Sequence, residues 1–258
     1  MLNNSFSQSG LQLVAYFFVI PMNINSKLLQ LYAPQWASLI ENGSKIKDQI
    51  LTNPMLLCFD EVKFSQADKR IMICGQETWE WAEFGSSIED SMAEYKSFFT
   101  DGEFYDGYGR SAFWKAFRFF EEQFARIFEG QKIQFIWQNL AKIGRNDGET
   151  GVTDEIRSLE RAYFPVVRDE MQLLQPDIVI FLTGPDRDHD IKFHFPDADF
   201  YQAGGESNLR RRAFVSSDAL PSATLRLYHP SYFGAWTEQY RAEAVSLLEK
   251  QFGAGNLA

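Results

Sequence analysis

Cysteine and histidine are scarce in this chain of 258 residues, which has two cysteines and three histidines. Cys58 and Cys74 form no C-x-x-C pair, so the sequence offers neither a disulfide framework nor enough thiolates for a four-cysteine cluster. We therefore expect no iron–sulfur cluster, no bound metal and no other cofactor. A reducing, cytoplasmic location fits this cysteine usage.

Positive charge is also in short supply. The chain has 25 lysines and arginines against 35 aspartates and glutamates, a formal net charge of -10 and a pI near 4.9. A protein whose whole surface embraces nucleic acid needs basic residues to neutralise phosphates, so this charge balance excludes that class. A local basic groove stays open as an alternative. The run 210–212, three arginines, is the best candidate for it, and a solvated loop is an equally good interpretation.

Long apolar runs are absent as well. The apolar stretch 11–22, "LQLVAYFFVIPM", is too short to span a bilayer. It also lacks a basic flank and a cleavage site, which argues against a signal peptide. We expect a strand or a packed extension there, with translation from Met22 as the alternative that would make 1–21 non-coding. No membrane partner is expected. The P-loop, G-x-G-x-x-G, G-x-S-x-G and H-E-x-x-H motifs do not occur.

Apolar and aromatic residues are plentiful. They make up 45% and 16% of the chain, and the aromatics include 24 phenylalanines, enough for one large core. We predict one domain over 46–258, preceded by an extension and a helix over 1–45 that packs on the core. The oligomeric state cannot be predicted from the sequence.

Apolar periodicity predicts alternating strands and helices. Strands are expected at 71–74, 133–140, 177–184 and 224–230. Helices are expected at 26–40, with an interruption near Pro34, at 113–128 after a Ser111 cap, at 153–174 and at 236–252. This order is typical of an α/β fold, a three-layer α/β/α sandwich with a mainly parallel four-stranded central sheet.

Polar residues follow each predicted strand. The strands end in Gly75-Gln76-Glu77, Gln138-Asn139, Thr183-Gly184 and His229-Pro230-Ser231. Ligands of such sheets sit beyond the carboxyl ends of the strands, so these side chains are expected to converge. Each one alone has a structural explanation: a tight turn, a cap or a strand stop.

Four segments resemble, in order, the motifs of the uracil-DNA glycosylase superfamily. They are "GQETW", "IWQNLAKIGR", "PDIVIFLTG" and "LYHPSYF", and they cover the chain from about Arg70 to Phe233. The chain is identified on these motifs as a divergent member with a glycosylase-like fold.

The resemblance implies roles for individual residues. Gly75 and Gln76 would back the flipped base, and Glu77 would position the attacking water. Asn139 would read the edge of the base, because a carboxamide presents a donor and an acceptor side by side. His229 would donate to the base oxygen that gains charge, which makes Glu77 and His229 the expected catalytic pair.

Further residues would complete the substrate site. Ser231 belongs to the His-Pro-Ser motif, and Tyr232 and Phe233 would wedge into the DNA where the base leaves. Trp79 would block a 5-methyl group. The aromatic that stacks on the base has no clear counterpart, and Phe84 and Trp81 are the candidates.

The sequence departs from the family's first motif. The best-known form has Asp, Pro and Tyr where this chain has Glu77, Thr78 and Trp79. The extra methylene of Glu77 would shift the water by about 1 Å, which is enough to slow the reaction severely.

The expected function is hydrolysis of the bond between uracil, or a related damaged base, and its sugar in DNA, as in base-excision repair. The alternative is a non-catalytic relative that binds a nucleobase or a nucleic-acid end. A metal-dependent hydrolase using "DRDHDIKFH" at 186–194 is a weaker rival, since its spacing matches no ligand pattern. The base, the strandedness of the substrate and the retention of catalysis stay open.

Overall fold

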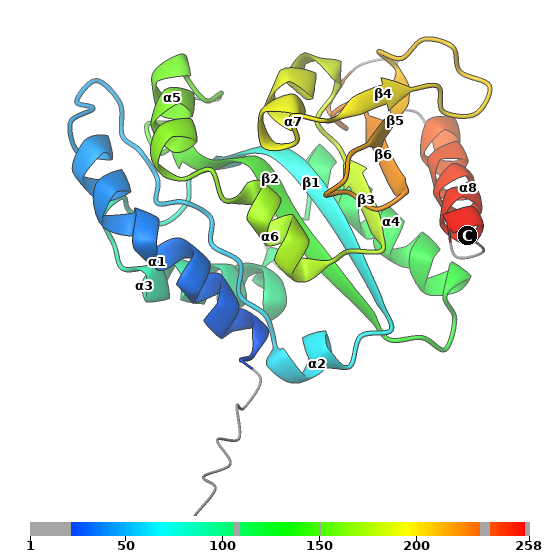
Figure 1. Cartoon of the computed structure of the whole chain (residues 1–258), viewed down its shortest axis with the longest axis horizontal. Coiled ribbons are helices and arrows are strands. Elements are labelled where there is room, and N and C mark those ends of the chain that lie inside the picture. The colour runs from blue at the N-terminus through cyan, green and yellow to red at the C-terminus, as the bar shows by residue number, and fades with distance from the viewer. Residues whose placement is uncertain (1–21, 106–108, 150, 233–237, 256–258) are drawn as a thin grey trace, which may run out of the picture.

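The computed structural model describes residues 22–105, 109–149, 151–232 and 238–255. Within them the chain forms an α/β fold around a six-stranded mixed sheet in the order β2-β1-β3-β6-β5-β4 (Figure 1). The four strands predicted from the sequence are neighbours and all parallel. They are β1 (Lys69–Trp79), β2 (Ile133–Arg145), β3 (Ile178–Phe181) and β6 (Ala223–Leu227).

The predicted count of four strands is wrong, because the segment between β3 and β6 extends the sheet. It contributes β4 (Asp199–Tyr201) and β5 (Arg212–Ser216), and both pairings at this edge are antiparallel. These strands are short, and β5 begins with an arginine, so no apolar run marks them. Arg212 is nevertheless buried, since its guanidinium bonds to Glu243 and to the Ala203 carbonyl.

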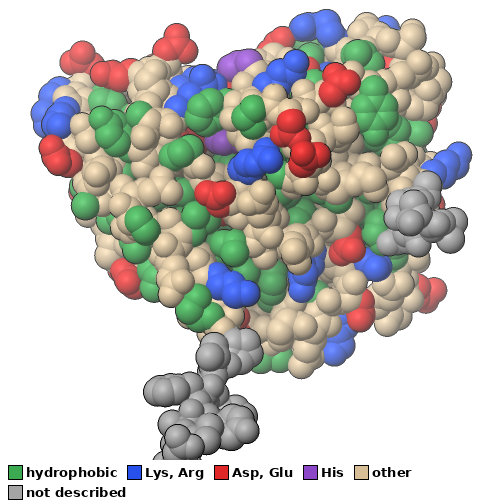
Figure 2. Space-filling model, viewed as in Figure 1, with side chains coloured by type: hydrophobic (Ala, Val, Ile, Leu, Met, Phe, Trp, Pro, Cys, Tyr) green, Lys and Arg blue, Asp and Glu red, His purple; other side chains and the backbone are tan. Residues whose placement is uncertain are grey.

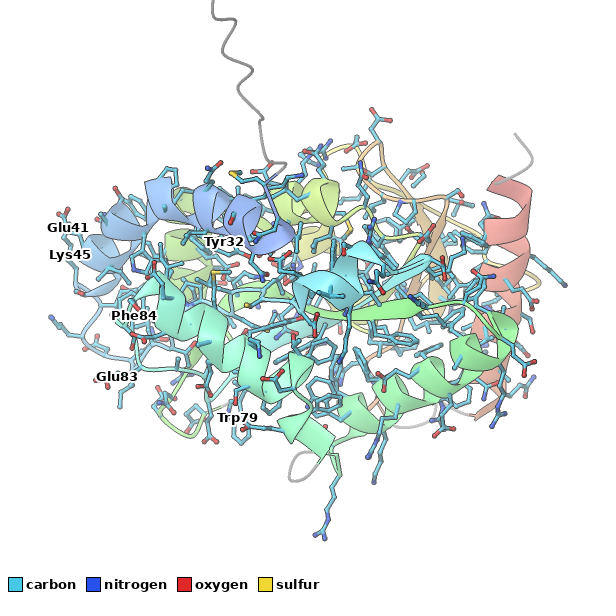
Figure 3. The ribbon with its side chains drawn as sticks, turned by 90° about the horizontal axis from the view of Figure 1, so that it is seen from below. Tyr32, Glu41, Lys45, Trp79, Glu83 and Phe84 are labelled. Atoms are coloured by element: carbon cyan, nitrogen blue, oxygen red, sulfur yellow. The ribbon has the colours of Figure 1, made fainter. Side chains whose placement is uncertain are left out.

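Helices lie on both sides of the sheet. Figure 3 shows α1 and α6 on one side and α3 and α4 on the other. The helical elements are α1 (Ile24–Gly43), α2 (Glu61–Ser65), α3 (Ile88–Tyr95), α4 (Ala112–Ile127), α5 (Asp154–Tyr163), α6 (Val167–Leu174), α7 (Asp188–His194), α8 (Glu238–Gly255), the π-helical η1 (Lys96–Thr100) and the 3₁₀ turns η2 (Glu103–Tyr105) and η3 (Pro185–Arg187).

Two proline effects differ from expectation. Helix α1 runs through Pro34 without the predicted interruption. An internal proline costs about 3 kcal/mol, and the burial of Leu28, Tyr32 and Leu39 on one stripe of α1 offsets it. The single helix predicted over 153–174 is in fact two, because Pro165 separates α5 from α6.

The aromatic helix α4 is confirmed. Its predicted cap, Ser111, accepts a hydrogen bond from the Trp114 backbone N–H at 3.2 Å. The phenylalanines of its stripe are buried from Phe117 onward, and Phe113 is half-buried.

Helix α1, which lies in the segment 1–45, belongs to the same hydrophobic cluster as the sheet. The apolar run at 11–22 lies outside the described residues except for Met22, and so does the predicted start of the last helix at Trp236. No helix in the described part of the chain is long and apolar enough to cross a membrane.

Candidate functional site

A cavity of about 630 Å³ opens over the C-terminal halves of β1 and β2 and the end of β6. This volume is typical of small-molecule and cofactor sites, which span about 300–1,000 Å³. The cavity brings together most of the predicted site residues: Gly75, Gln76, Glu77, Trp79, Asn139, His229 and Ser231, together with the stacking candidate Trp81.

Gly75 sits inside β1 rather than after it, since the strand continues to Trp79. It pairs with Asn139 across the β1–β2 ladder. A Cβ at position 75 would lie 2.4 Å from Asn139 Oδ1 and 3.2 Å from Phe113 Cε2. Glycine is therefore needed here because the Asn139 carboxamide leans directly over the backbone of β1.

The Asn139 side chain has a fixed orientation. It is 2% exposed, and its Nδ2 donates to Thr78 Oγ1 at 3.2 Å. The Thr78 hydroxyl donates in turn to the Ala141 carbonyl at 3.2 Å, so its oxygen must be the acceptor for Asn139. Oδ1 is left without a donor among the described residues, which makes it an acceptor available at the cavity.

Gln76 follows the same pattern. Its Nε2 donates to the Thr183 carbonyl at 2.6 Å, at the end of β3. No described residue donates to its Oε1. Thr183 thus contributes only its backbone, and Gln76 presents an acceptor oxygen to the cavity.

Glu77 is held by a partner that the sequence did not indicate. Its Oε2 accepts from Arg187 Nη2 at 2.7 Å and from the Val152 N–H at 3.2 Å. Both charged side chains of this ion pair are 17% exposed. Within the described chain, Oε1 has no donor, so one carboxylate oxygen is saturated and the other stays open to a water or a ligand.

His229 is a neutral donor in this geometry. Its Nδ1 lies 2.6 Å from Ser231 Oγ and accepts from the Ser231 N–H at 3.4 Å, which puts the ring proton on Nε2. Burial lowers the pKa of His229, and the nearby Glu77 carboxylate opposes that shift. At neutral pH the imidazole is therefore uncharged, with Nε2–H as its donor.

Aromatic rings form much of the cavity wall. The Trp81 and Trp114 rings meet Trp137 edge-on, with centroids 5.6 Å and 5.0 Å away. Trp137 stacks on Tyr95 at an interplanar angle of 13°, and the Tyr95 hydroxyl donates to the Trp137 carbonyl at 2.9 Å. The Tyr95 contacts hold the wall in place.

Two predicted contacts do not line the cavity, and a third falls outside the described residues. Phe84 does not line the cavity, because the chain turns back and packs its ring on the end of α1. A Cβ at Gly43 would lie 2.2 Å from Phe84 Cζ, and Figure 3 shows Phe84 near Lys45 and away from Trp79. Tyr232 is 53% exposed and stacks on Tyr228. Phe233 lies outside the described residues.

The sequence reasoning missed about half of the described lining. Trp137 stands two residues before Asn139 and so shares its face of β2, a signal that strand periodicity offers. The others come from helices and loops, where the pattern showed only core or solvent. These missed residues are Glu80, Glu94, Phe98, Ser111, Phe113, Trp114, Trp137 and Gly151.

The remaining polar candidates are engaged with each other. The arginines at 210–212 pair with Asp186, Glu206 and Glu243. Within 186–194, Asp190 meets Arg157 and Arg161 at 2.7 and 2.8 Å. Acidic and basic side chains are intermingled over the face seen in Figure 2. In the described part of the chain no group of three or more histidine, cysteine, aspartate or glutamate residues is placed to hold a metal ion.

No family model matches the chain, and no curated protein matches it. The chemistry of the cavity therefore has to be inferred from its own residues: an open carboxylate oxygen, a neutral imidazole donor and two outward-facing amide oxygens within aromatic walls.

Proposed function

We propose that this protein is a divergent member of the uracil-DNA glycosylase superfamily that hydrolyses the bond between a damaged base and its sugar in DNA. The observation that carries the proposal is the meeting of Glu77, Asn139 and His229 in one cavity. These residues come from or follow three different strands, β1, β2 and β6. The fold implied is the three-layer α/β/α sandwich, with the two antiparallel strands as an addition.

The geometry supports a division of labour. Breaking a base–sugar bond requires an acceptor for the attacking water and a donor at the base. Glu77 Oε1 supplies the acceptor, and His229 Nε2–H supplies the donor. Asn139 Oδ1, fixed by Thr78, selects a base edge that carries an N–H group.

A base-release assay tests this proposal. Single- and double-stranded oligonucleotides that each carry one damaged base are incubated with the protein, and free base is measured. We expect release by the wild type, and about a hundredfold slower release by His229→Ala and Asn139→Ala, since each removes a polar contact to the base. His189→Ala, which changes an exposed histidine outside the cavity, is the matched control. Release that survives both cavity variants would refute the assignment.

A second candidate function is binding without hydrolysis, and one contact favours it. Arg187 holds the Glu77 carboxylate in an ion pair at 2.7 Å, so Glu77 has a structural role that does not require hydrolysis. Binding of the same oligonucleotides that depends on Asn139, with no free base released, would support this candidate over the enzyme.

A further inference from the structure

The cavity carries the wrong charge for a base that leaves as an anion. Its described lining contains three carboxylates, Glu77, Glu80 and Glu94, and neither lysine nor arginine. Arg187 neutralises Glu77 from behind. Glu80 and Glu94 are exposed, and their side chains form no hydrogen bond or ion pair with any described residue. Negative charge at this mouth attracts a cation and opposes negative charge on a departing base.

The aromatic walls point the same way. Four of the chain's six tryptophans line the cavity, whereas among the described phenylalanines only Phe98 and Phe113 do. Tryptophan is the side chain whose face attracts cations most strongly. Apolar bulk alone does not explain the tryptophans at the cavity, because phenylalanine supplies that bulk elsewhere in this protein.

The polar atoms at the cavity are mostly acceptors. The side-chain amides of Gln76 and Asn139 each donate a hydrogen bond within the protein, and their oxygens accept none from any described residue. Two donors are also unsatisfied: the ring nitrogens of Trp81 and Trp137 are buried and have no acceptor among the described residues. A ligand with amino groups would meet the open oxygens of Gln76 and Asn139, and a simple quaternary ammonium ion would not.

Resting on the glycosylase function proposed above, we propose that the base taken by this cavity is a purine made cationic by alkylation of a ring nitrogen. The chemistry balances without any further reactant. The bond between the sugar C1′ and the base nitrogen breaks, and its electron pair neutralises the charged ring. The oxygen of water bonds to C1′, and the proton it loses passes to solvent by way of Glu77.

Base release from matched oligonucleotides tests the substrate class. One oligonucleotide carries a single N7-methylguanine and the other a single uracil, and each rate is corrected for loss without protein. We expect release of N7-methylguanine to exceed that of uracil by about tenfold or more. Release of uracil alone would overturn the substrate class and leave the glycosylase function standing.

Tryptophan fluorescence supplies a readout that does not depend on hydrolysis. N7-methylguanosine should quench it at concentrations about tenfold lower than guanosine or uridine. The double variant Glu80→Gln, Glu94→Gln should lose most of that preference, and Glu89→Gln, an exposed site on the same helix α3, should keep it. Selective binding without release of either base would refute hydrolysis and support the cation site. Equal binding of N7-methylguanosine and guanosine would overturn the inference.

Discussion

The two faces of strand β2 treat polar residues in opposite ways. On the face toward α1 and α6, Lys142 and Glu170 form an ion pair at 2.8 Å with no exposure of either side chain. The hydroxyl of Tyr32 and the amide of Gln138 each donate to the Glu170 carboxylate at 2.6 Å. Every charged atom of this closed network has a partner.

The opposite face carries Asn139, one residue along the same strand. Its carboxamide is as buried as the closed network, yet its oxygen has no donor in the described chain and faces a cavity. Burial alone therefore does not separate structural polar groups from functional ones. The completeness of their hydrogen bonding does, because an unpaired polar group buried in a protein costs free energy that a ligand can recover.

The largest expected effect comes from breaking the closed network. Glu170→Leu leaves the Lys142 ammonium buried without a counterion, so we expect the free energy of unfolding to fall by about 3–5 kcal/mol in urea titrations. Lys142→Met combined with Glu170→Leu should recover about half of that loss, since the double variant removes both members of the ion pair.

The exposed pair of Glu41 and Lys45 is the matched control. Glu41 lies in the last turn of α1 and Lys45 just after the helix, and both side chains are exposed, whereas Tyr32 of α1 points into the protein (Figure 3). Glu41→Leu should leave stability unchanged within error. A single variant at Glu170 that proves as stable as the wild type would show that the network contributes nothing, and the contrast between the faces would fail.

The next effect separates the two histidines whose pKa is lowered. His194 is the buried last residue of α7. Its Nε2–H donates to the Leu140 carbonyl at 2.8 Å, and burial lowers its pKa to about 4. Because the pKa of His194 is lower in the folded protein than its ordinary value of 6.5, its neutral form stabilises the fold fully above pH 6.5. That contribution to the free energy of unfolding is lost as the pH falls toward 4. We expect a loss of about 3 kcal/mol over that interval in the wild type, and its absence in His194→Gln.

Glu160 gives a slope of the opposite sign. Burial raises its pKa to about 7 from 4.5, so its contribution is present at low pH and fades as the pH rises through that range. Comparing His194→Gln with the wild type at each pH cancels this background. His229→Gln should change the stability profile in the same direction but by less, because the Glu77 carboxylate opposes the lowering of the His229 pKa. Parallel profiles for wild type and His194→Gln would contradict the assignment.

The parts of the fold that sequence predicted well share a physical origin. The strands β1, β2, β3 and β6 carry dense apolar runs, and α4 repeats phenylalanine at helical spacing after a serine cap. Such patterns follow from burial on both faces or on one stripe. Strands β4 and β5 carry no such pattern, since the sheet edge is stabilised by tertiary partners of Arg212.

The residues of the candidate site also fall into a group that the sequence pattern predicts and a group that it does not. The rule that ligands lie beyond parallel strands placed Glu77, Asn139 and His229 near one another, and they do share the cavity. Arg187 and Trp114 reach the site from separate segments, and no local sequence pattern predicts that either residue lies there. The pairing of Glu77 with Arg187 spans 110 positions, a distance over which no periodicity carries information.

The smallest expected effect on stability comes from adding one methyl group at Gly75, next to Asn139 on the face of β2 that borders the cavity. Gly75→Ala would place its Cβ against Asn139 Oδ1, and Thr78 tethers the other end of that carboxamide, so the amide has to tilt away. We expect a destabilisation of about 1 kcal/mol or less and a loss of base binding of about tenfold. Gly205→Ala, where the methyl group meets open space and the backbone is ordinary, should change neither quantity. If Gly75→Ala binds as tightly as the wild type, the Asn139 oxygen is not the group that selects the ligand, because the substitution displaces that atom first.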